Sequence, residues 1–319
     1  MVTIKDVAKK AGVSISTASY AINDDPRISK KTKEKVLEVA RSLNYYPNAA
    51  ARNLKRKKTN IVGVFVDGFK GPVYSKILDG IHLELTNNKY NIIVSSGESG
   101  RKLLLERQVD GAIIIDRSLS DELIIHVAKN GIPCILLDRR LSGKNIYESM
   151  LKNEEIVYEL IVEMIKKGYR KIGYVSGSPN SYDNLHRFKG LVKALTEHNL
   201  STEYYYKGDF TKESGYIAGK QILNSGDLPD FIFCANDEMA IGVMDAFIEQ
   251  NIKIPEDIGV AGFDNIELSY YYTPKLTTID VEHFSWGREL SKAIIKIIEK
   301  KAKKINVEAN CKIIYRESC

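Results

Sequence analysis

The chain has 319 residues, of which 44% are hydrophobic and 28% charged, as is typical of a globular protein with room for two or three domains. No apolar run approaches about 18 residues and charges interrupt every apolar window near the N-terminus, which excludes a membrane-spanning helix and a signal peptide. Residues 1–60 carry 14 Lys and Arg against 5 Asp and Glu, whereas the remainder has a net charge of −3, so we expect a polyanionic partner for the N-terminal part alone. On charge alone, the alternative is a solvated basic surface.

Three short helices are predicted in the first 45 residues. Thr3 begins the first helix and Gly12 ends it, Ser14 begins a second that extends to about Asn23, and Ser29 begins the third. A turn of three or four residues containing glycine joins the first two helices. This arrangement is the signature of a helix-turn-helix.

The second helix, within "VSISTASYAINDD", has two different faces. One is a small apolar stripe of Ala18, Ala21 and Ile22. The other combines Ile15, Ser16, Ser19, Tyr20 and Asn23. In a helix-turn-helix this second helix lies in the DNA major groove, where hydroxyl and amide groups can bond base edges and an aliphatic group can contact a thymine methyl. The alternative is a small helical scaffold, which needs no such polar face.

A basic segment follows Pro47. Its sequence "NAAARNLK" predicts a helix of barely two turns within residues 49–58, which is marginal in isolation. Five cations crowd it, so we expect it to fold when phosphates neutralise them. Leu54 has no nearby core to enter. The alternative is a flexible linker whose leucine packs on a domain surface.

From residue 60, short apolar runs alternate with amphipathic helices, which predicts parallel sheets covered on both faces by helices. The predicted strands are 61–66, 91–96, 111–116, 134–138, 171–177, 231–236 and 259–264. The predicted helices are 75–88, 121–130, 153–167, 184–198, 212–223, 238–250 and 284–300. Two groups of strands, at 60–138 and 171–263, indicate two lobes.

Ligands of open α/β sheets bind beyond the carboxyl ends of the strands. Polar residues gather at these positions: 67–74, 95–96, 116–117, 138–139, 176, 236–237 and 264–265. The alternative, that such residues only cap the following helix, is kept for Ser95, Asp116 and Ser176. Asp237 is also predicted to be a helix cap.

The chain closely resembles the lactose/galactose repressor (LacI–GalR) family over almost its whole length. The matching motifs include "TIKDVAKKAGVSISTASYAIN", "NYYPNAAARNLK", "VDGAIIID", "RFKGL", "ANDEMAIGVMDAF", "IPEDIGVAGFDN" and "YRES". The resemblance implies an α/β protein: a small all-α helix-turn-helix head joined by a hinge helix to a two-lobed, periplasmic-binding-protein-like body with parallel sheets. The implied domains are 1–48 (head), 49–58 (hinge), 59–150 plus 281–306 (first lobe) and 151–280 plus 307–319 (second lobe).

The resemblance also implies site residues. The DNA-binding set is Thr3, Ser14, Ile15, Ser16, Thr17, Ser19, Tyr20, Asn23, Asn48, Ala51, Arg52, Leu54 and Lys55. The effector-binding set is Val73, Tyr74, Asp138, Asp183, Arg187, Phe210, Asn236 and Asp264. In the family, two hinge helices of a dimer lie in the minor groove, where Leu54 would open the central base step. Phe210 would stack on the effector.

Three positions depart from the family pattern. Tyr20 stands where many members have an arginine that can read guanine, so we expect a different operator base there. Lys152-Asn153 replaces the usual Asp-Asn; together with Lys70, Arg139 and Arg140, this predicts a cleft more cationic than a sugar site. The segment before residue 109 is shortened, which predicts only a stubby crossover there.

The sequence therefore predicts a cytoplasmic, homodimeric transcription regulator, most simply a repressor, that binds a near-palindromic operator and a small effector, a sugar or another polar metabolite. Neither a cofactor nor a metal is expected, because the five histidines are scattered and Cys134, Cys234, Cys311 and Cys319 form no C-x-x-C pair, as in a reduced compartment. The histidines are interpreted as surface or supporting residues. An enzyme is disfavoured because "GESG" and "SGSPNS" match no phosphate-binding motif. A periplasmic solute-binding protein would share the body but not the basic head.

Overall fold

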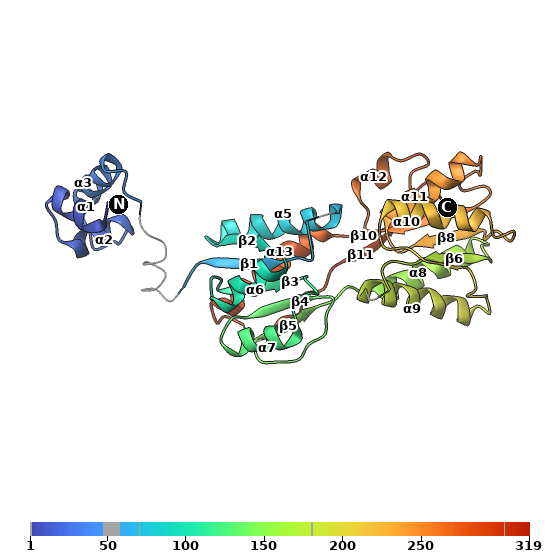
Figure 1. The fold of residues 1–319 in the computed structure, drawn as a ribbon, viewed down its shortest axis with the longest axis horizontal. Helices are drawn as coiled ribbons and strands as arrows, with labels where there is room; N and C mark the ends of the chain where they lie inside the picture. The colour runs from blue at the N-terminus through green and yellow to red at the C-terminus, as the bar shows by residue number, and fades with distance from the viewer. Residues whose placement is uncertain (1, 47–57, 70, 180, 303) are drawn as a thin grey trace. The chain divides into compact units, whose positions relative to one another are not determined.

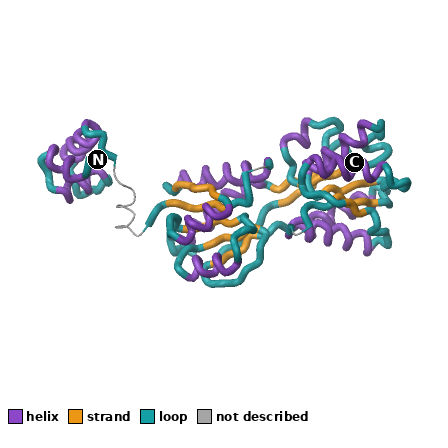
Figure 2. Tube along the Cα trace, in the orientation of Figure 1, coloured by secondary structure: helices purple, strands orange, loops and turns teal. Residues whose placement is uncertain are grey.

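The computed structural model describes residues 2–46, 58–69, 71–179, 181–302 and 304–319. They divide at residues 59 and 60 into two compact units, which we call the head and the body (Figures 1 and 2). Nearly all of the hinge helix predicted at 49–58 lies outside the described residues, as do Asn48, Ala51, Arg52, Leu54 and Lys55. None of the described helices is both long and apolar enough to cross a bilayer.

The head consists of the three predicted helices, α1 (Ile4–Ala11), α2 (Ile15–Ile22) and α3 (Lys30–Ser42). Gly12 ends α1 in the left-handed conformation, with φ of 66°, and the Ser14 hydroxyl caps α2 by accepting the Thr17 N–H. The core is made mostly of small side chains: Val7, Ala8, Ala11, Ala18, Ala21, Val36 and Ala40. Because alanines let helix axes approach closely, three short helices can enclose this core.

The first lobe of the body has a parallel sheet in the order β2-β1-β3-β4-β5. Its strands are β1 (Ile61–Phe65), β2 (Asn91–Ser95), β3 (Gly111–Ile114), β4 (Cys134–Leu137) and β5 (Ile146–Ser149). Side chains alternate between the two faces: Val62 and Val64 join one apolar cluster and Phe65 joins the other. Helices α5 (Pro72–Asn87) and α13 (His283–Ile298) cover the first face, and α6 (Gly97–Leu105) and α7 (Asp121–Lys129) cover the second.

The second lobe has a sheet in the order β11-β10-β9-β8-β6-β7, in which only β11 is antiparallel to its neighbour. The strands are β6 (Ile172–Val175), β7 (Tyr205–Tyr206), β8 (Phe231–Cys234), β9 (Gly259–Phe263), β10 (Thr277–Val281) and β11 (Cys311–Ile314). The helices are α8 (Asn153–Lys166), α9 (Tyr182–Glu197), α10 (Lys212–Leu223), α11 (Asp237–Glu249) and α12 (Glu267–Tyr271). Helices α8 and α9 lie on one face and α10 and α11 on the other (Figure 1).

The predicted fold class, a helix-turn-helix head and two α/β lobes with parallel sheets, is confirmed. All seven predicted strands form, and each predicted helix of the body begins within three residues of its expected start. The crossover before residue 109, predicted to be stubby, contains the nine-residue helix α6. The chain passes between the lobes after β5, between β10 and α13, and between α13 and β11.

Candidate functional site

The outer face of α2 carries the polar residues predicted to contact DNA. Ile15 is 49% exposed and Ser16 is exposed, whereas Ser19 and Tyr20 are half-buried. The Asn23 amide donates a hydrogen bond of 2.7 Å to the Ser19 carbonyl.

Three other predicted residues of the head have bonds within it. The Ser14 and Thr17 hydroxyls lie 2.8 Å apart, and the Thr3 hydroxyl donates to Asp6 at 2.8 Å. Ser14, Thr17 and Thr3 therefore help to hold the helix starts, while Ile15 and Ser16 project outwards.

The body contains a cavity of about 460 Å³ between its two lobes, within the usual range for small-molecule sites. Val73 and Tyr74 line it from the start of α5, and Asp138 from the end of β4. The second lobe contributes the other five predicted residues: Asp183, Arg187, Phe210, Asn236 and Asp264. All eight residues of the predicted effector-binding set therefore meet at one cavity, because the carboxyl ends of both sheets face it.

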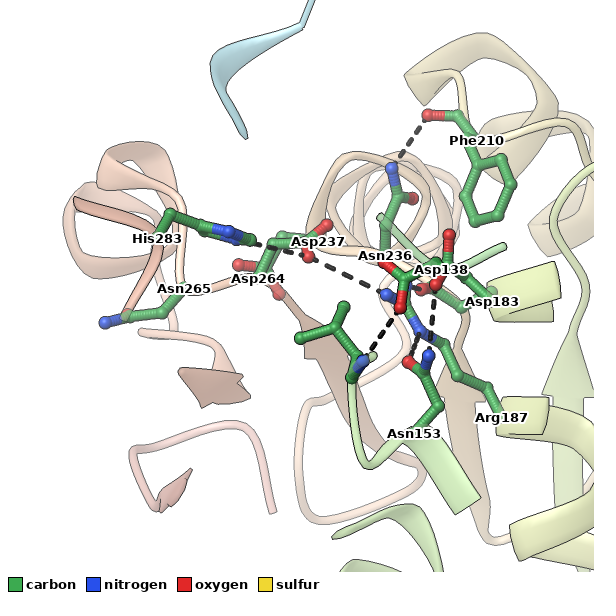
Figure 3. Close-up of polar contacts among 12 residues, drawn as sticks. Asp138, Asn153, Asp183, Arg187, Phe210, Asn236, Asp237, Asp264, Asn265 and His283 are labelled. Carbon is green, nitrogen blue, oxygen red and sulfur yellow. Dashed lines mark hydrogen bonds and ion pairs between the residues drawn. The ribbon is translucent and has the colours of Figure 1, made fainter. Parts of the chain in front are cut away.

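Arg187 is the centre of a buried polar network (Figure 3). Its Nε donates to the Asn153 amide oxygen at 2.9 Å, and the Asn153 nitrogen donates to Asp183 Oδ1 at 3.0 Å. Its guanidinium lies 3.5 Å from the ring centroid of Phe263 and 4.0 Å from Asp264 Oδ1. Held on two sides, Arg187 is fixed in orientation at the cavity wall.

Asp264 and His283 lie next to each other at the cavity wall. The Nε2 of His283, at the first residue of α13, lies 3.6 Å from Asp264 Oδ1. Burial would raise the pKa of Asp264, but the neighbouring His283 and the charge of Arg187 hold that pKa below its ordinary value. His283 is 3% exposed, and among the described residues neither ring nitrogen has a hydrogen-bond partner. Its interpretation as a surface or supporting residue is therefore wrong, since it lines the cavity itself.

Asp138 is buried at the opposite wall. It accepts the Leu151 N–H at 2.7 Å. Its burial, and secondly the negative charge of Asp183, raise the pKa of Asp138 well above its ordinary value. The cavity therefore brings together one carboxyl group that favours the neutral form and another, Asp264, that favours the charged form.

Asn236 shapes the wall beside Phe210. Its side-chain oxygen accepts the Met239 N–H and so caps α11, and its nitrogen donates to the Phe210 carbonyl at 2.9 Å. The prediction that Asp237 is the helix cap is wrong, because this role belongs to Asn236. Asp237 is instead fully buried one layer behind the cavity, where it accepts the Thr278 hydroxyl at 2.5 Å and the Ile266 N–H at 2.9 Å.

The expectation of a cationic cleft is wrong. Among the described residues, the cavity is lined by five acidic side chains, Asp67, Asp138, Asp183, Glu238 and Asp264, against two guanidinium groups, Arg117 and Arg187. Lys152 turns away to pair with Glu308 at 2.7 Å, and Arg139 pairs with Asp121. Arg140 does not line the cavity, and Lys70 lies outside the described residues.

The interpretation that Asp116 caps the following helix is wrong, because the N-cap of α7 is Ser120; Asp116 accepts the N–H of Gly97, the first residue of α6, at 2.9 Å and that of Ser118 at 2.7 Å. Neither Asp116 nor Ser95 nor Ser176 lines the cavity. Sequence reasoning missed His283 and Trp286, which line it from α13. His283 follows β10 as other cavity residues follow their strands, but β10 begins with two threonines and is not among the predicted strands.

Comparisons with known proteins cover both units. The model of the bacterial regulatory proteins of the lacI family matches residues 3–48, and that of the periplasmic binding protein-like domain matches residues 161–319. A probable HTH-type transcriptional repressor of Bacillus subtilis, ExuR, is 33% identical over 96% of this chain and 95% of its own length. Catabolite control protein A of Priestia megaterium is 32% identical over 94% of this chain and 93% of its own.

Solved structures of transcriptional regulators are also similar to this chain. A crystal structure of the lac repressor dimer bound to operator and the anti-inducer ONPF has a TM-score of 0.88 at 28% identity, covering 99% of this chain and 98% of that one. A sugar-binding transcriptional regulator from Enterococcus faecalis has a TM-score of 0.74 at 33% identity over 82% of this chain and 98% of its own. The similarity thus extends over the head as well as the body.

Proposed function

Because the chain belongs to the lacI family of bacterial regulatory proteins, and is therefore a DNA-binding transcriptional repressor with an effector-binding domain and not an enzyme, we propose that the residues lining the cavity control its affinity for DNA. In this proposal the head of a cytoplasmic homodimer binds a near-palindromic operator. A sugar or another small polar metabolite binds between the lobes. The observation that carries the proposal is the convergence of eight predicted residues from both lobes on one cavity.

The proposed effector contacts follow from the chemistry of each side chain. Arg187 and Asp264 present a guanidinium donor and a carboxylate acceptor on the second lobe, which suits the hydroxyl groups of a polar ligand. Phe210 offers a ring for stacking, and Val73 and Tyr74 close the cavity from the first lobe. A ligand that contacts both lobes stabilises the arrangement in which those contacts are best, and this is how it can shift operator affinity.

The proposed DNA-binding residues lie partly in the head and partly in the hinge segment, most of which is outside the described residues. Residues of the α2 face would contact base edges, and Thr3, Ser14 and Thr17 would support the helix starts or contact phosphates. The hinge residues Asn48, Ala51, Arg52, Leu54 and Lys55 enter the proposal on the family resemblance alone. The domain division is proposed as 1–48, 49–58, 59–150 plus 281–306, and 151–280 plus 307–319.

The test is the response of operator affinity to an effector. The fluorescence of Trp286, the one tryptophan of the sequence, can report compounds that enter the cavity it lines. Operator duplexes selected from random DNA are then titrated by fluorescence anisotropy with and without each active compound. We expect Asp264→Ala and Asp264→Asn to abolish the response while leaving effector-independent affinity within about tenfold, or roughly 1.4 kcal/mol.

The matched control is Glu213→Ala, which removes an exposed carboxylate from α10 of the same lobe and should respond like the parent. Asp264→Asn retains a side chain that tolerates positive φ, so it separates the loss of the charge from a disturbed backbone. Asp264 variants that respond at the parent's effector concentration would contradict the assignment of the cavity.

A further inference from the structure

Arg27, in the turn between α2 and α3, stacks on the outer face of the helix predicted to enter the major groove. The central carbon of its guanidinium lies 4.3 Å from the ring centroid of Tyr20. Its Nε donates to Asp25 Oδ1 at 2.8 Å and its Nη2 donates to Asp25 Oδ2 at 2.7 Å. The Arg27 backbone N–H also donates to Asp25, at 3.0 Å. The guanidinium is thus held on one face and one edge, although the side chain is 67% exposed.

The bonds with Asp25 occupy only part of the guanidinium. Arginine has five N–H donors in one plane. The edge formed by Nε and Nη2 faces the carboxylate, which leaves the donors of Nη1 and the second donor of Nη2 for a ligand. Two parallel N–H groups match two neighbouring acceptors, and in the major groove guanine presents such a pair in O6 and N7.

We propose that Arg27, held by Asp25 against the ring of Tyr20, reads a guanine in each operator half-site. This inference rests on the proposed DNA-binding function of the head. Helix α2 contains no arginine, and Tyr20 cannot make a bidentate contact with guanine. The inference places this contact on Arg27, in the turn that follows α2. Tyr20 then acts as the platform for Arg27 and not as the reader.

The local charges favour a base edge over a phosphate. Asp25 lies beside the guanidinium and largely offsets its positive charge, and its carboxylate would repel a nearby phosphate. A phosphate contact gains from net positive charge and needs little orientation. A guanine contact requires a guanidinium plane that is held at a fixed angle. The contacts of Arg27 with Asp25 and Tyr20 provide this fixed orientation.

The experiment selects binding sites from randomised duplexes with the full-length protein, and then measures affinity by fluorescence anisotropy on duplexes that differ at one base. We expect the parent to prefer guanine at one position of each half-site. Arg27→Ala and Arg27→Lys should lose this preference by on the order of ten- to a hundredfold, because lysine is not a planar two-donor group. Tyr20→Phe, which preserves the platform, should retain it. Asp25→Asn should weaken the preference while binding of unselected DNA becomes no weaker.

The matched control is Arg41→Ala, an exposed arginine near the end of α3, which should retain the guanine preference. Circular dichroism melts check that every head variant folds. Two outcomes would overturn the inference: an Arg27→Ala protein with the parent's guanine preference, or one that binds all duplexes more weakly by an equal factor with a smaller salt dependence, as a phosphate contact predicts. If the parent enriches no sequence at all, the proposed DNA-binding function itself fails.

Discussion

Three residues of the cavity have backbone conformations that side chains other than glycine seldom adopt. Asp138, Phe210 and Asp264 have φ of 49°, 74° and 102°. Such conformations are unfavourable in isolation and persist where surrounding bonds hold them. The N–H of Asp264 donates to the Ile279 carbonyl at 2.8 Å, and Asn236 holds the Phe210 carbonyl. The strain is thus located where side chains must turn towards the cavity.

Asp138 should make the stability of the body depend on pH. Its folded-state pKa is raised, so as pH rises from about 4 the unfolded chain releases its proton first. The free energy of unfolding should therefore fall with rising pH until the folded-state pKa is reached. Asp138→Asn should remove this contribution, of up to about 1.4 kcal/mol per pH unit, and asparagine tolerates the positive φ.

Urea unfolding of parent and variant between pH 4 and pH 8 measures this effect. The difference in stability should shift in favour of Asp138→Asn as pH rises. Glu213→Gln, which changes an exposed carboxylate, serves as the control and should follow the parent at every pH. A constant difference between parent and Asp138→Asn across this range would show that folding does not raise the pKa of Asp138.

At the scale of elements, the packing of α5 against α13 sets the position of the first-lobe cavity residues. A β-carbon at Gly80 would lie 2.1 Å from the Phe284 carbonyl oxygen, and one at Gly287 would lie 2.2 Å from that of Ile77. The two helices are therefore in backbone contact at both glycines. Because α13 carries His283 and Trp286, this contact fixes how far both side chains reach into the cavity.

Gly287→Ala should force α5 and α13 apart. Overpacking of this kind costs about 1–3 kcal/mol, which urea unfolding monitored by Trp286 fluorescence would measure. The emission of the folded variant should also change, because the bond from the Trp286 indole to the Ser149 hydroxyl, 2.8 Å long, would be disturbed. Ser285→Ala, an exposed substitution on the same helix, should change neither property. Parent-like stability of Gly287→Ala would mean that the helices can separate freely.

The elements that could be predicted from the sequence are those with strong local patterns. The predicted strands are apolar runs, and all but β2, which lies at a sheet edge, are largely buried. After four of them, β1, β4, β8 and β9, the next polar residue lines the cavity. Strands β5 and β11 are at sheet edges and contain polar residues, and β10 begins with buried threonines, so none has an apolar run of this kind. Without β10, the position of His283 at a strand end could not be inferred.

The charge of the cleft could not be predicted for a different reason. The sequence gives the formal charge of Lys152 and Arg139 but not the direction of their long side chains. Glu308, which pairs with Lys152, is more than 150 residues away in the chain. Such pairings depend on the crossing of the chain between the lobes, which local patterns do not encode.

At the scale of the whole molecule, positive charge is concentrated in residues 1–60, while the remainder is mildly negative. DNA binding should therefore depend steeply on salt, because each neutralised phosphate releases counterions. For roughly six to ten phosphate contacts, raising salt from about 50 to about 200 mM should weaken binding by about 10³ to 10⁵. Anisotropy titrations of the full-length protein at several salt concentrations measure the slope.

Arg101→Ala is the matched control, since it removes an exposed cation from α6 of the body and should leave the slope unchanged. Lys10→Ala, a cation on α1 of the head, should reduce the slope if that face approaches phosphates. A slope near zero for the parent would contradict electrostatic binding by the head.

The repeated passage of the chain between the lobes has a consequence for proteolysis. The first lobe is built from residues up to the end of β5 and from α13, so a protease cut in a loop before β5 leaves an N-terminal piece whose strands and α5 stay packed against the rest of the lobe, including α13. A nicked body should therefore migrate as a single species on a native gel and separate into fragments only in denaturant. Mapping such nicks offers a way to find loops whose exposure changes with a bound metabolite, without labelling the protein.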